Sequence, residues 1–189
     1  APSGAGKTTI CHRLLGAHRR MVYSVSCTTR PPRHHEVDGR DYHFLSSERF
    51  EQLISAGAFL EHATVHGYRY GTLRAPVVEA LEGGRDVLMD IDVQGAANVR
   101  RAAHDAPPDD PIRRAFLDIF IRPPSLAELR RRLAQRATDS PAVIERRLAN
   151  AQAELNRASE YRYVVVNDDL DQAVAEIERI LDQERARRT

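Results

Sequence analysis

The first nine residues constrain this chain more strongly than any other segment. They read APSGAGKTT, which is nearly the phosphate-binding P-loop pattern G-x-x-x-x-G-K-[ST], with Ala1 at the position of the first glycine. A loop of this kind turns successive backbone N–H groups toward one point at a helix N-terminus, where partial positive charge favours an anion. Gly4 and Gly6 can adopt backbone angles that a side chain would disfavour. The segment therefore predicts a site for a nucleoside triphosphate.

The side chains that follow the second glycine support the same interpretation. Lys7 would reach the outer phosphates, and the hydroxyl of Thr8 would face Mg²⁺. The alternative is a glycine-rich turn before an ordinary helix, but the intact Gly-Lys-Thr and the amphipathic run at 9–15 argue against it. The predicted ATP-binding residues of this segment are Ser3, Gly4, Ala5, Gly6, Lys7, Thr8 and Thr9.

A P-loop normally follows a buried strand that holds it at the edge of a sheet. No residue precedes Ala1 in this sequence. We therefore expect the first strand of the sheet to be missing from this chain.

The charge and cysteine content argue against several classes of protein. With 28 Lys and Arg residues against 27 Asp and Glu, the net charge of +1 does not suggest a nucleic-acid partner. Cys11 and Cys27 lack C-x-x-C spacing and do not suggest a disulfide scaffold. No apolar run reaches membrane-spanning length, so no membrane partner is expected. His34 and His35 are adjacent, unlike the i, i+4 pair of a helical zinc site. These features and the P-loop together predict a cytoplasmic enzyme.

Strand-like and helix-like segments alternate along the chain, which predicts an α/β fold. Helices are expected at 7–18, 47–56, 73–82, 126–136 and 142–157, with a final helix whose apolar stripe is Leu170, Val174, Ile177 and Leu181. Strands are expected at 22–25, 86–91, 116–121 and 164–166. Short extended pieces between 26 and 72 indicate a small inserted subdomain, and 103–114 is expected to be a surface loop.

A second basic motif lies in this insertion, where 24–33 read SVSCTTRPPR and 39–42 read GRDY. Arg30 and Arg33 are three residues apart, and the proline pair between them restricts the backbone. Guanidinium groups bind phosphate oxygens bidentately, so the two arginines suit a phosphate. Taken alone, the motif is better explained as a solvated basic loop. Beside a P-loop, a second phosphate site indicates phosphoryl transfer between nucleotides.

Five motifs, in order along the chain, resemble the guanylate kinase family. They are SGAGKT at 3–8, SVSCTTRPPR at 24–33, DGRDYHF at 38–44, DIDVQG at 90–95 and VNDDL at 166–170, and the resemblance runs from Pro2 to about Ile180. It implies a GMP site made of Ser26, Arg30, Arg33, Tyr42, Glu61, Tyr70, Thr72 and Asp92. By the same resemblance, the arginines and tyrosines would hold the 5′-phosphate, and the carboxylates and hydroxyls would meet the guanine.

The resemblance also implies an architecture. A P-loop core with the helix-flanked parallel sheet of nucleoside monophosphate kinases would comprise 1–25, 73–122 and 157–189. A small, mixed, β-rich GMP-binding insertion would occupy 26–72, and a helical lid would occupy 123–156. The substrates would be Mg²⁺·ATP and GMP, with dGMP as a further acceptor. Asn167 matches a position near the adenine of ATP, where its amide would pair with the 6-amino edge.

The chemistry of guanine supports a carboxylate at position 61. Guanine presents N1–H and 2-amino donors beside the O6 acceptor, so Glu61 would accept from the donors while a hydroxyl donates to O6. Adenine lacks N1–H, and a buried polar site left unpaired by the wrong base discriminates by roughly 10⁴-fold or more. The alternatives are an exposed strand carboxylate for Glu61 and strand-end caps for Asp90 and Asp92. Asp90, at the end of a strand, would orient waters of the Mg²⁺ or Lys7.

Arginines of the expected lid form a third group. Arg132 and Arg136 are four residues apart on one helix face, so both can point at the same phosphates. The family's lid carries arginines at positions matching these two and Arg147, and cations aligned with the migrating phosphoryl group stabilise the transition state most. A solvated helical face is the alternative, and it is the better interpretation for Arg130 and Arg131. The predicted catalytic residues are Lys7, Arg132, Arg136 and Arg147.

The resemblance thus implies a kinase that transfers the γ-phosphoryl group of Mg·ATP to GMP, giving ADP and GDP. Two alternatives remain. A related ribose-bisphosphate phosphokinase would share the P-loop but would have no need of the residues that read guanine. A guanylate-kinase-like scaffold module binds phosphorylated peptides where GMP would sit and typically has a degraded P-loop, whereas Gly6, Lys7 and Thr8 are all present here.

Overall fold

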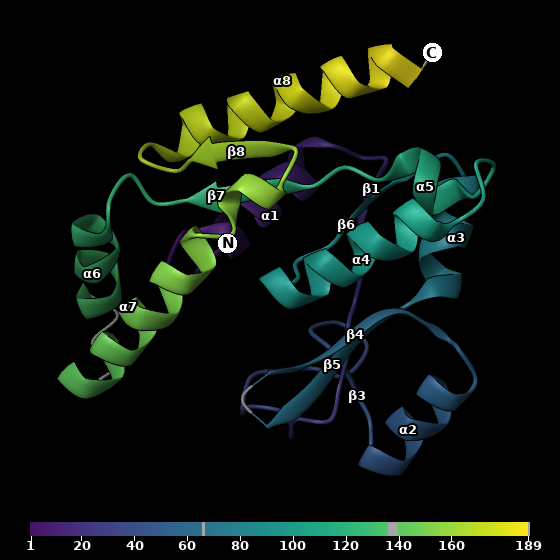
Figure 1. The fold of residues 1–189 in the computed structure, drawn as a ribbon, viewed down its shortest axis with the longest axis horizontal. Coiled ribbons are helices and arrows are strands. Elements are labelled where there is room, and N and C mark those ends of the chain that lie inside the picture. Colours follow the sequence, from purple (N-terminus) through teal and green to yellow (C-terminus); the bar gives the residue numbers. More distant parts are fainter. Residues whose placement is uncertain (66, 136–139, 189) are drawn as a thin grey trace. The chain divides into compact units, whose positions relative to one another are not determined.

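The computed structural model describes residues 1–65, 67–135 and 140–188. The chain divides into two compact units: unit 1 comprises Ala1–His18 and Leu117–Thr189, and unit 2 comprises Arg19–Phe116. Each unit contains its own pair of parallel strands together with helices (Figure 1). The α/β fold expected from the sequence is therefore confirmed.

Unit 1 is built on the parallel strands β7 (Ile119–Arg122) and β8 (Tyr163–Val166), with Ile119 opposite Tyr163. Its helices are α1 (Lys7–Ala17), α6 (Leu126–Gln135), α7 (Pro141–Leu155) and α8 (Leu170–Arg188), with a 3₁₀ turn at Ala158–Glu160. Helix α8 packs against both α1 and β8, and α6 packs against α7 (Figure 1). All of these elements except the 3₁₀ turn were expected from the sequence, with ends that differ by up to three residues.

Apolar side chains at strand and helix spacing form the core of unit 1. Phe120 and Val165, on neighbouring strands, are fully buried. Of the stripe expected on the last helix, Val174 and Ile177 are buried, and Ile180 is buried where Leu181 was expected. The predicted helical period is therefore confirmed. The buried face ends on Ile180 instead of Leu181 because, with 3.6 residues per turn, residues three and four positions after Ile177 lie on nearly the same face of the helix.

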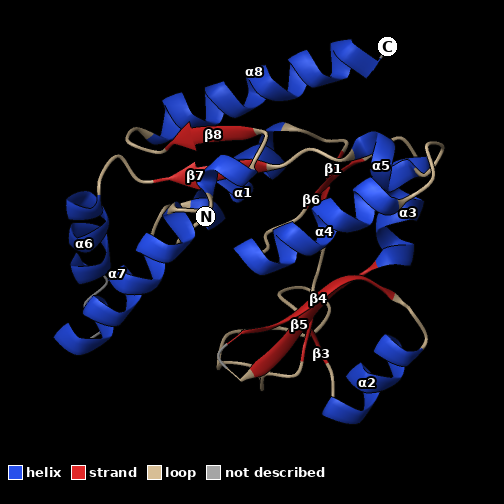
Figure 2. Ribbon diagram, in the orientation of Figure 1, coloured by secondary structure: helices blue, strands red, loops and turns tan. Residues whose placement is uncertain are grey.

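Unit 2 contains the parallel pair β1 (Met21–Tyr23) and β6 (Asp86–Leu88) and a mixed four-stranded sheet. The order of that sheet is β3 (His43–Phe44), β2 (Cys27–Thr28), β5 (Tyr68–Leu73) and β4 (Phe59–Val65), with β2 parallel to β3 and antiparallel to β5 (Figure 2). The helices are α2 (Ser47–Ser55), α3 (Arg74–Glu82), α4 (Val93–Asp105) and α5 (Pro111–Ala115). The mixed sheet lies almost entirely within the insertion expected at 26–72.

The surface loop expected at 103–114 is shorter than predicted and is confined to 106–110. Helix α4 extends to Asp105, and α5 begins at Pro111. Ala103 and Ile112 are both buried in a cluster with Leu60, Val77 and Val99. The Pro- and Asp-rich composition did not predict the short helix α5. Its N-terminus is capped by Asp110, whose side chain accepts the backbone N–H of Ile112, and a proline occupies its first turn.

No helix in the described part of the chain is long and apolar enough to cross a membrane.

The strand expected at 86–91 ends earlier, at Leu88, and the residues after it lead into α4. The division of the chain into a core, an insertion and a lid stays a prediction.

Candidate functional site

In unit 1, the P-loop presents the N-terminus of α1 as an anion site. Gly4 and Gly6 have φ angles of +91° and +89°, in the left-handed region that favours glycine. Lys7 opens the helix, and Thr8 and Thr9 are exposed in its first turn. The N-cap of α1 is Gly6, which has no side chain to cap the helix, and the first turn contains no acidic residue. The arrangement suits a negatively charged group such as a phosphate.

The two glycines also allow close packing that the motif alone did not reveal. A Cβ atom at Gly6 would lie 2.2 Å from Asn167 Nδ2. A Cβ atom at Gly4 would lie 3.0 Å from Leu129 Cδ1 and 3.1 Å from Leu133 Cδ2, both on α6. The P-loop therefore rests against α6 on one side and against the end of β8 on the other, and both glycines are needed for contact as well as for conformation.

Asn167 makes a contact that was not expected from the sequence. Its Nδ2 donates a hydrogen bond to the backbone carbonyl of Ala5 at 2.8 Å, and the residue is 5% exposed. Its backbone N–H donates to Arg122 O at 2.8 Å, which extends the pairing of β7 and β8. The side chain thus ties the P-loop to the strand pair, and its pairing with adenine stays a prediction.

Two of the arginines expected in the lid, Arg132 and Arg147, lie on α6 and α7. Arg132 Nε donates to Glu128 Oε1 at 2.7 Å, and Arg131 also donates to both oxygens of Glu128. Hydrogen bonds from Arg131 and Arg132 lower the pKa of Glu128 to about 2. Arg147 is half-buried on α7, and Arg136 lies outside the described residues. Leu129 and Leu133 on α6 pack against Ala151 of α7, so one face of the helix pair is apolar and Arg130 and Arg131 lie on the exposed face.

In unit 2, the structure brings a carboxylate and a hydroxyl together inside the mixed sheet. Glu61 on β4 lies opposite Thr72 on β5, and Thr72 Oγ1 donates to Glu61 Oε1 at 2.9 Å. Glu61 is only 6% exposed. Burial, with a smaller contribution from the nearby charge of Asp92, raises the pKa of Glu61 to about 7, against the lowering effect of the Thr72 hydrogen bonds. The exposed strand carboxylate considered for Glu61 is therefore excluded.

Asp92 forms the N-cap of α4, as the strand-end alternative predicted. Its Oδ1 accepts the backbone N–H groups of Gln94 at 3.1 Å and Gly95 at 2.8 Å. A Cβ atom at Gly95 would lie 3.0 Å from Glu61 Oε2 and 3.4 Å from Asp92 Oδ1. Gly95 therefore lets both carboxylates approach the first turn of α4. It was not assigned from the sequence, where a glycine three residues after the Asp92 cap was the available signal.

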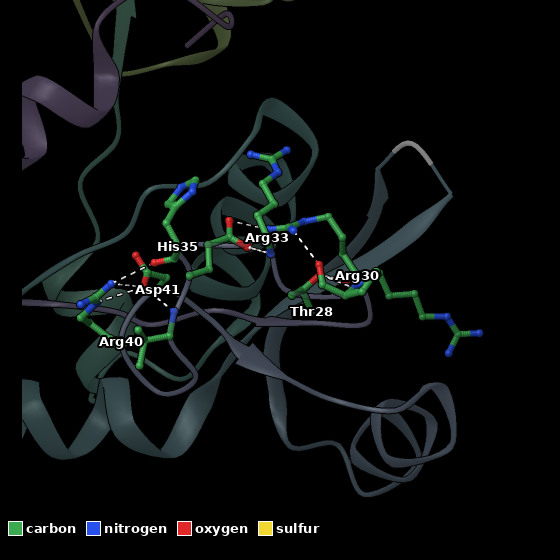
Figure 3. A network of polar contacts seen from close by, with 10 residues as sticks. Thr28, Arg30, Arg33, His35, Arg40 and Asp41 are labelled. Carbon is green, nitrogen blue, oxygen red and sulfur yellow. Dashed lines mark hydrogen bonds and ion pairs between the residues drawn. The ribbon is translucent and has the colours of Figure 1, made fainter.

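One of the residues expected at the 5′-phosphate, Arg30, forms an ion pair with Glu36. Arg30 Nη2 donates to both oxygens of Glu36, at 2.8 and 2.9 Å (Figure 3). The Arg30 guanidinium lies 5.4 Å from the ring centre of Tyr42, and the Tyr42 and Tyr70 rings meet edge to face at 5.9 Å. Arg33 is exposed, and its guanidinium points away from this network (Figure 3). Glu36 was not assigned from the sequence.

The remaining expected residues of unit 2 lie at strand ends. Ser26 is half-buried directly before β2, and its carbonyl accepts the His43 backbone N–H. Asp90 is half-buried two residues after β6 ends.

Burial raises the pKa of Tyr42, and the charges of Tyr70 and Asp90 add to that effect. Tyr42, Tyr70 and Asp90 thus share one electrostatic environment with Arg30.

A model of the guanylate kinase family matches residues 1–184. The chain belongs to the guanylate kinase family. It is 51% identical over 188 residues to the guanylate kinase of Anaeromyxobacter dehalogenans (strain 2CP-C), covering 99% of this chain and 79% of that protein. It is 48% identical over 187 residues to the guanylate kinase of Chelativorans sp. (strain BNC1), covering 99% of this chain and 82% of that protein.

A solved structure agrees with this assignment. The crystal structure of guanylate kinase from Anaplasma phagocytophilum matches with a TM-score of 0.74 and 35% sequence identity, covering 94% of this chain and 81% of that one. The resemblance inferred from five motifs, the P-loop α/β fold class and the assignment to nucleoside monophosphate kinases are therefore confirmed. The roles of individual site residues stay predictions.

Proposed function

We propose that this chain transfers the γ-phosphoryl group of Mg·ATP to GMP, giving ADP and GDP, in the cytoplasm. The observation that carries the proposal is the buried carboxylate of Glu61, held by Thr72 and bordered by the first turn of α4. A carboxylate in this setting needs donors, because an unpaired buried charge is costly. Guanine offers two adjacent donors, N1–H and the 2-amino group, and adenine does not.

The rest of the GMP would be held by residues around Glu61. Asp92 would assist at the 2-amino edge and the Ser26 hydroxyl would donate to O6, while the Thr72 hydroxyl, which donates to Glu61 Oε1, would hold that carboxylate for the base. The 5′-phosphate would bind Arg30, Arg33, Tyr42 and Tyr70. Arginine suits this role because its planar fork matches two phosphate oxygens, and tyrosine adds a neutral O–H donor. Because dGMP carries the same base and phosphate, the same residues would accept it.

The triphosphate would bind at the P-loop of unit 1. Backbone N–H groups between Ser3 and Thr9 would surround the phosphates, with Lys7 on the outer ones. Mg²⁺ would arrive with ATP, where it neutralises charge on the phosphates. The exposed Thr8 hydroxyl fits this ion, since Mg²⁺ keeps several waters and takes few protein ligands. Asp90 would orient one of those waters.

The phosphoryl transfer requires positive charge around the migrating group rather than a general base. The acceptor is an anionic phosphate, so positioning and neutralisation of the migrating group suffice. Lys7 would supply one positive charge, and Arg132, Arg136 and Arg147 would supply the others. Closure of the arginine-bearing helices over the phosphates would also exclude water, which would otherwise hydrolyse ATP.

The experiment that tests this function measures ADP formation from Mg·ATP with GMP, dGMP, AMP, UMP or no acceptor. GMP-dependent turnover with little activity toward AMP and UMP is the expected result. Equal rates with AMP and GMP would contradict the role of Glu61. Turnover that is absent while GMP still binds would contradict the kinase and favour a binding module.

A further inference from the structure

Glu36 is hydrogen-bonded to Arg30, one of the arginines that the proposed function assigns to the phosphate of GMP. Its two oxygens accept from Arg30 Nη2 at 2.8 and 2.9 Å, and the Arg30 and Glu36 side chains are only 11% and 8% exposed. Arg30 Nη1 donates to Pro31 O at 2.7 Å, and its guanidinium lies over the rings of Tyr42 and Phe44. The Arg30 guanidinium is therefore fixed by a carboxylate, a carbonyl and two aromatic rings.

The same carboxylate also closes the loop that carries the second arginine. Glu36 Oε2 accepts the Arg33 backbone N–H at 2.7 Å, and the Glu36 backbone N–H donates to Arg33 O at 3.0 Å. Among the described residues, no hydrogen bond or ion pair joins a partner to the Arg33 guanidinium, which points away from the network (Figure 3). Glu36 thus fixes the Arg33 backbone and leaves its guanidinium available.

This ion pair differs from two other arginine pairs described in unit 2. Arg40 with Asp41 and Arg69 with Glu51 are pairs in which at least one side chain is well exposed. Such exposed pairs contribute little to stability. The Arg30–Glu36 pair is shielded from water, and hydrogen bonds from Arg30 hold the pKa of Glu36 below its usual value. Glu36 is therefore ionised, and its contact with Arg30 is a fixed feature of the phosphate loop.

We propose that Glu36 is a positioning residue that holds Arg30 and the Arg33 backbone ready for the 5′-phosphate of GMP. This inference rests on the proposed function. Arg30 Nη2 is bonded to Glu36 and Nη1 to Pro31, and a side-chain hydrogen bond joins Arg30 to Tyr70, so a phosphate would meet those of the five N–H donors that these partners leave. Because the guanidinium is already held in one orientation, little conformational entropy is lost when the phosphate binds.

The test compares GMP with guanosine, which has the same base and sugar but no phosphate. Binding of each ligand to the wild-type chain and to Glu36→Ala would be measured by calorimetry. The ratio of GMP to guanosine affinity is expected to fall about 10- to 100-fold in Glu36→Ala, as for loss of charge-assisted hydrogen bonds. Guanosine affinity and the KM for ATP are expected to stay unchanged. Glu36→Gln, which keeps the shape, should give a smaller fall and carries the test if Glu36→Ala does not fold.

Glu51→Ala is the matched control, because it removes a glutamate from an arginine pair on the surface of the same unit. It should leave the ratio at the wild-type value. An unchanged ratio in Glu36→Ala would overturn the proposal, and so would tighter GMP binding, which would make Glu36 a competitor for Arg30. Equal losses for GMP and guanosine would overturn it too, because they would indicate a structural role only. A wild-type chain that binds neither ligand would overturn the proposed function and this inference with it.

Discussion

The two units offer nucleotides different kinds of chemical group. In unit 1, the P-loop presents backbone N–H groups in a turn that Gly4 and Gly6 make possible, at an uncapped helix N-terminus. In unit 2, the candidate guanine and phosphate contacts are side chains, above all Glu61 and Arg30. Backbone groups recognise any phosphate, whereas the arrangement of side chains distinguishes one base from another.

This difference has an electrostatic consequence. Backbone N–H groups carry no titratable charge, so a P-loop does not change its charge near neutral pH. Burying Glu61 among β4, β5 and α4 raises its pKa to about 7. The proposed base recognition in unit 2 would therefore depend on a carboxylate that is only partly ionised near neutrality before the ligand arrives.

Both units nevertheless pair a candidate phosphate-binding arginine with a glutamate. Arg132 is bonded to Glu128 in unit 1, and Arg30 is bonded to Glu36 in unit 2. Glu128 bonds two arginines on the outside of α6, whereas Glu36 bonds one arginine in a shielded loop. We expect the shielded pair to position its arginine more strictly, because water competes less with it.

The largest expected effect comes from changing the side chain that reads the base. In Glu61→Gln, an amide N–H₂ faces the guanine donors, so the preference for GMP over AMP should fall by up to about 10⁴-fold. The measurement is kcat/KM for both acceptors at saturating Mg·ATP. Glu79→Gln, on the exposed face of α3, is the matched control. An unchanged preference would remove Glu61 from the guanine site.

The next effect concerns the one charged side chain of the P-loop. Lys7→Ala removes the chain's only lysine, and kcat should fall about 10²- to 10³-fold because a cation beside the migrating group is lost. The Kd for GMP should be unchanged, which calorimetry can check. Arg13→Ala, which removes an exposed cation from the same helix, is the control. Full residual activity in Lys7→Ala would refute the assigned role.

A smaller effect is expected from changing the backbone of the P-loop. Gly6→Ala places a Cβ atom at a φ of +89° and 2.2 Å from Asn167 Nδ2, so ATP affinity should fall about 10- to 100-fold. Gly16→Ala, on the same helix with open space around it, is the control. Asn167→Ala removes the clash but also the bond to Ala5 O and the predicted adenine contact, so the double variant Gly6→Ala/Asn167→Ala is compared with Asn167→Ala alone. Gly6→Ala should cost less ATP affinity in that background than in the wild type, and an equal cost in both would show that φ strain alone is responsible.

The smallest expected effect is the pH dependence of GMP binding. Ionised Glu61 offers acceptor oxygens to both guanine donors, whereas the protonated acid would turn an O–H toward one of them, so affinity should rise with pH through about 7, by about tenfold between pH 6 and pH 8. The Kd for GMP would be measured across this range in the wild type and in Glu61→Gln. Because both proteins bind the same ligand, titration of its phosphate cancels. Equal slopes in the two proteins would show that Glu61 does not titrate there.

Local sequence patterns predicted most elements because helix and strand periods are set within a few residues. The helix after the P-loop, the α6–α7 pair and the buried stripe of α8 were all predicted in this way. Helix α4 was not recognised, although its buried residues Val93, Ala96, Val99 and Ala103 recur at helical spacing.

The sequence by itself determined the P-loop, the α/β alternation and the family, since each depends on residues that are contiguous or fall in a fixed order. The tertiary structure alone decided which distant residues meet: Glu61 with Thr72 and Gly95, and Asn167 with Ala5. It also decided that Glu61 is buried, and hence that its pKa is raised. The physical reason is that backbone conformation is a local property, whereas burial and side-chain partners depend on how separate elements pack.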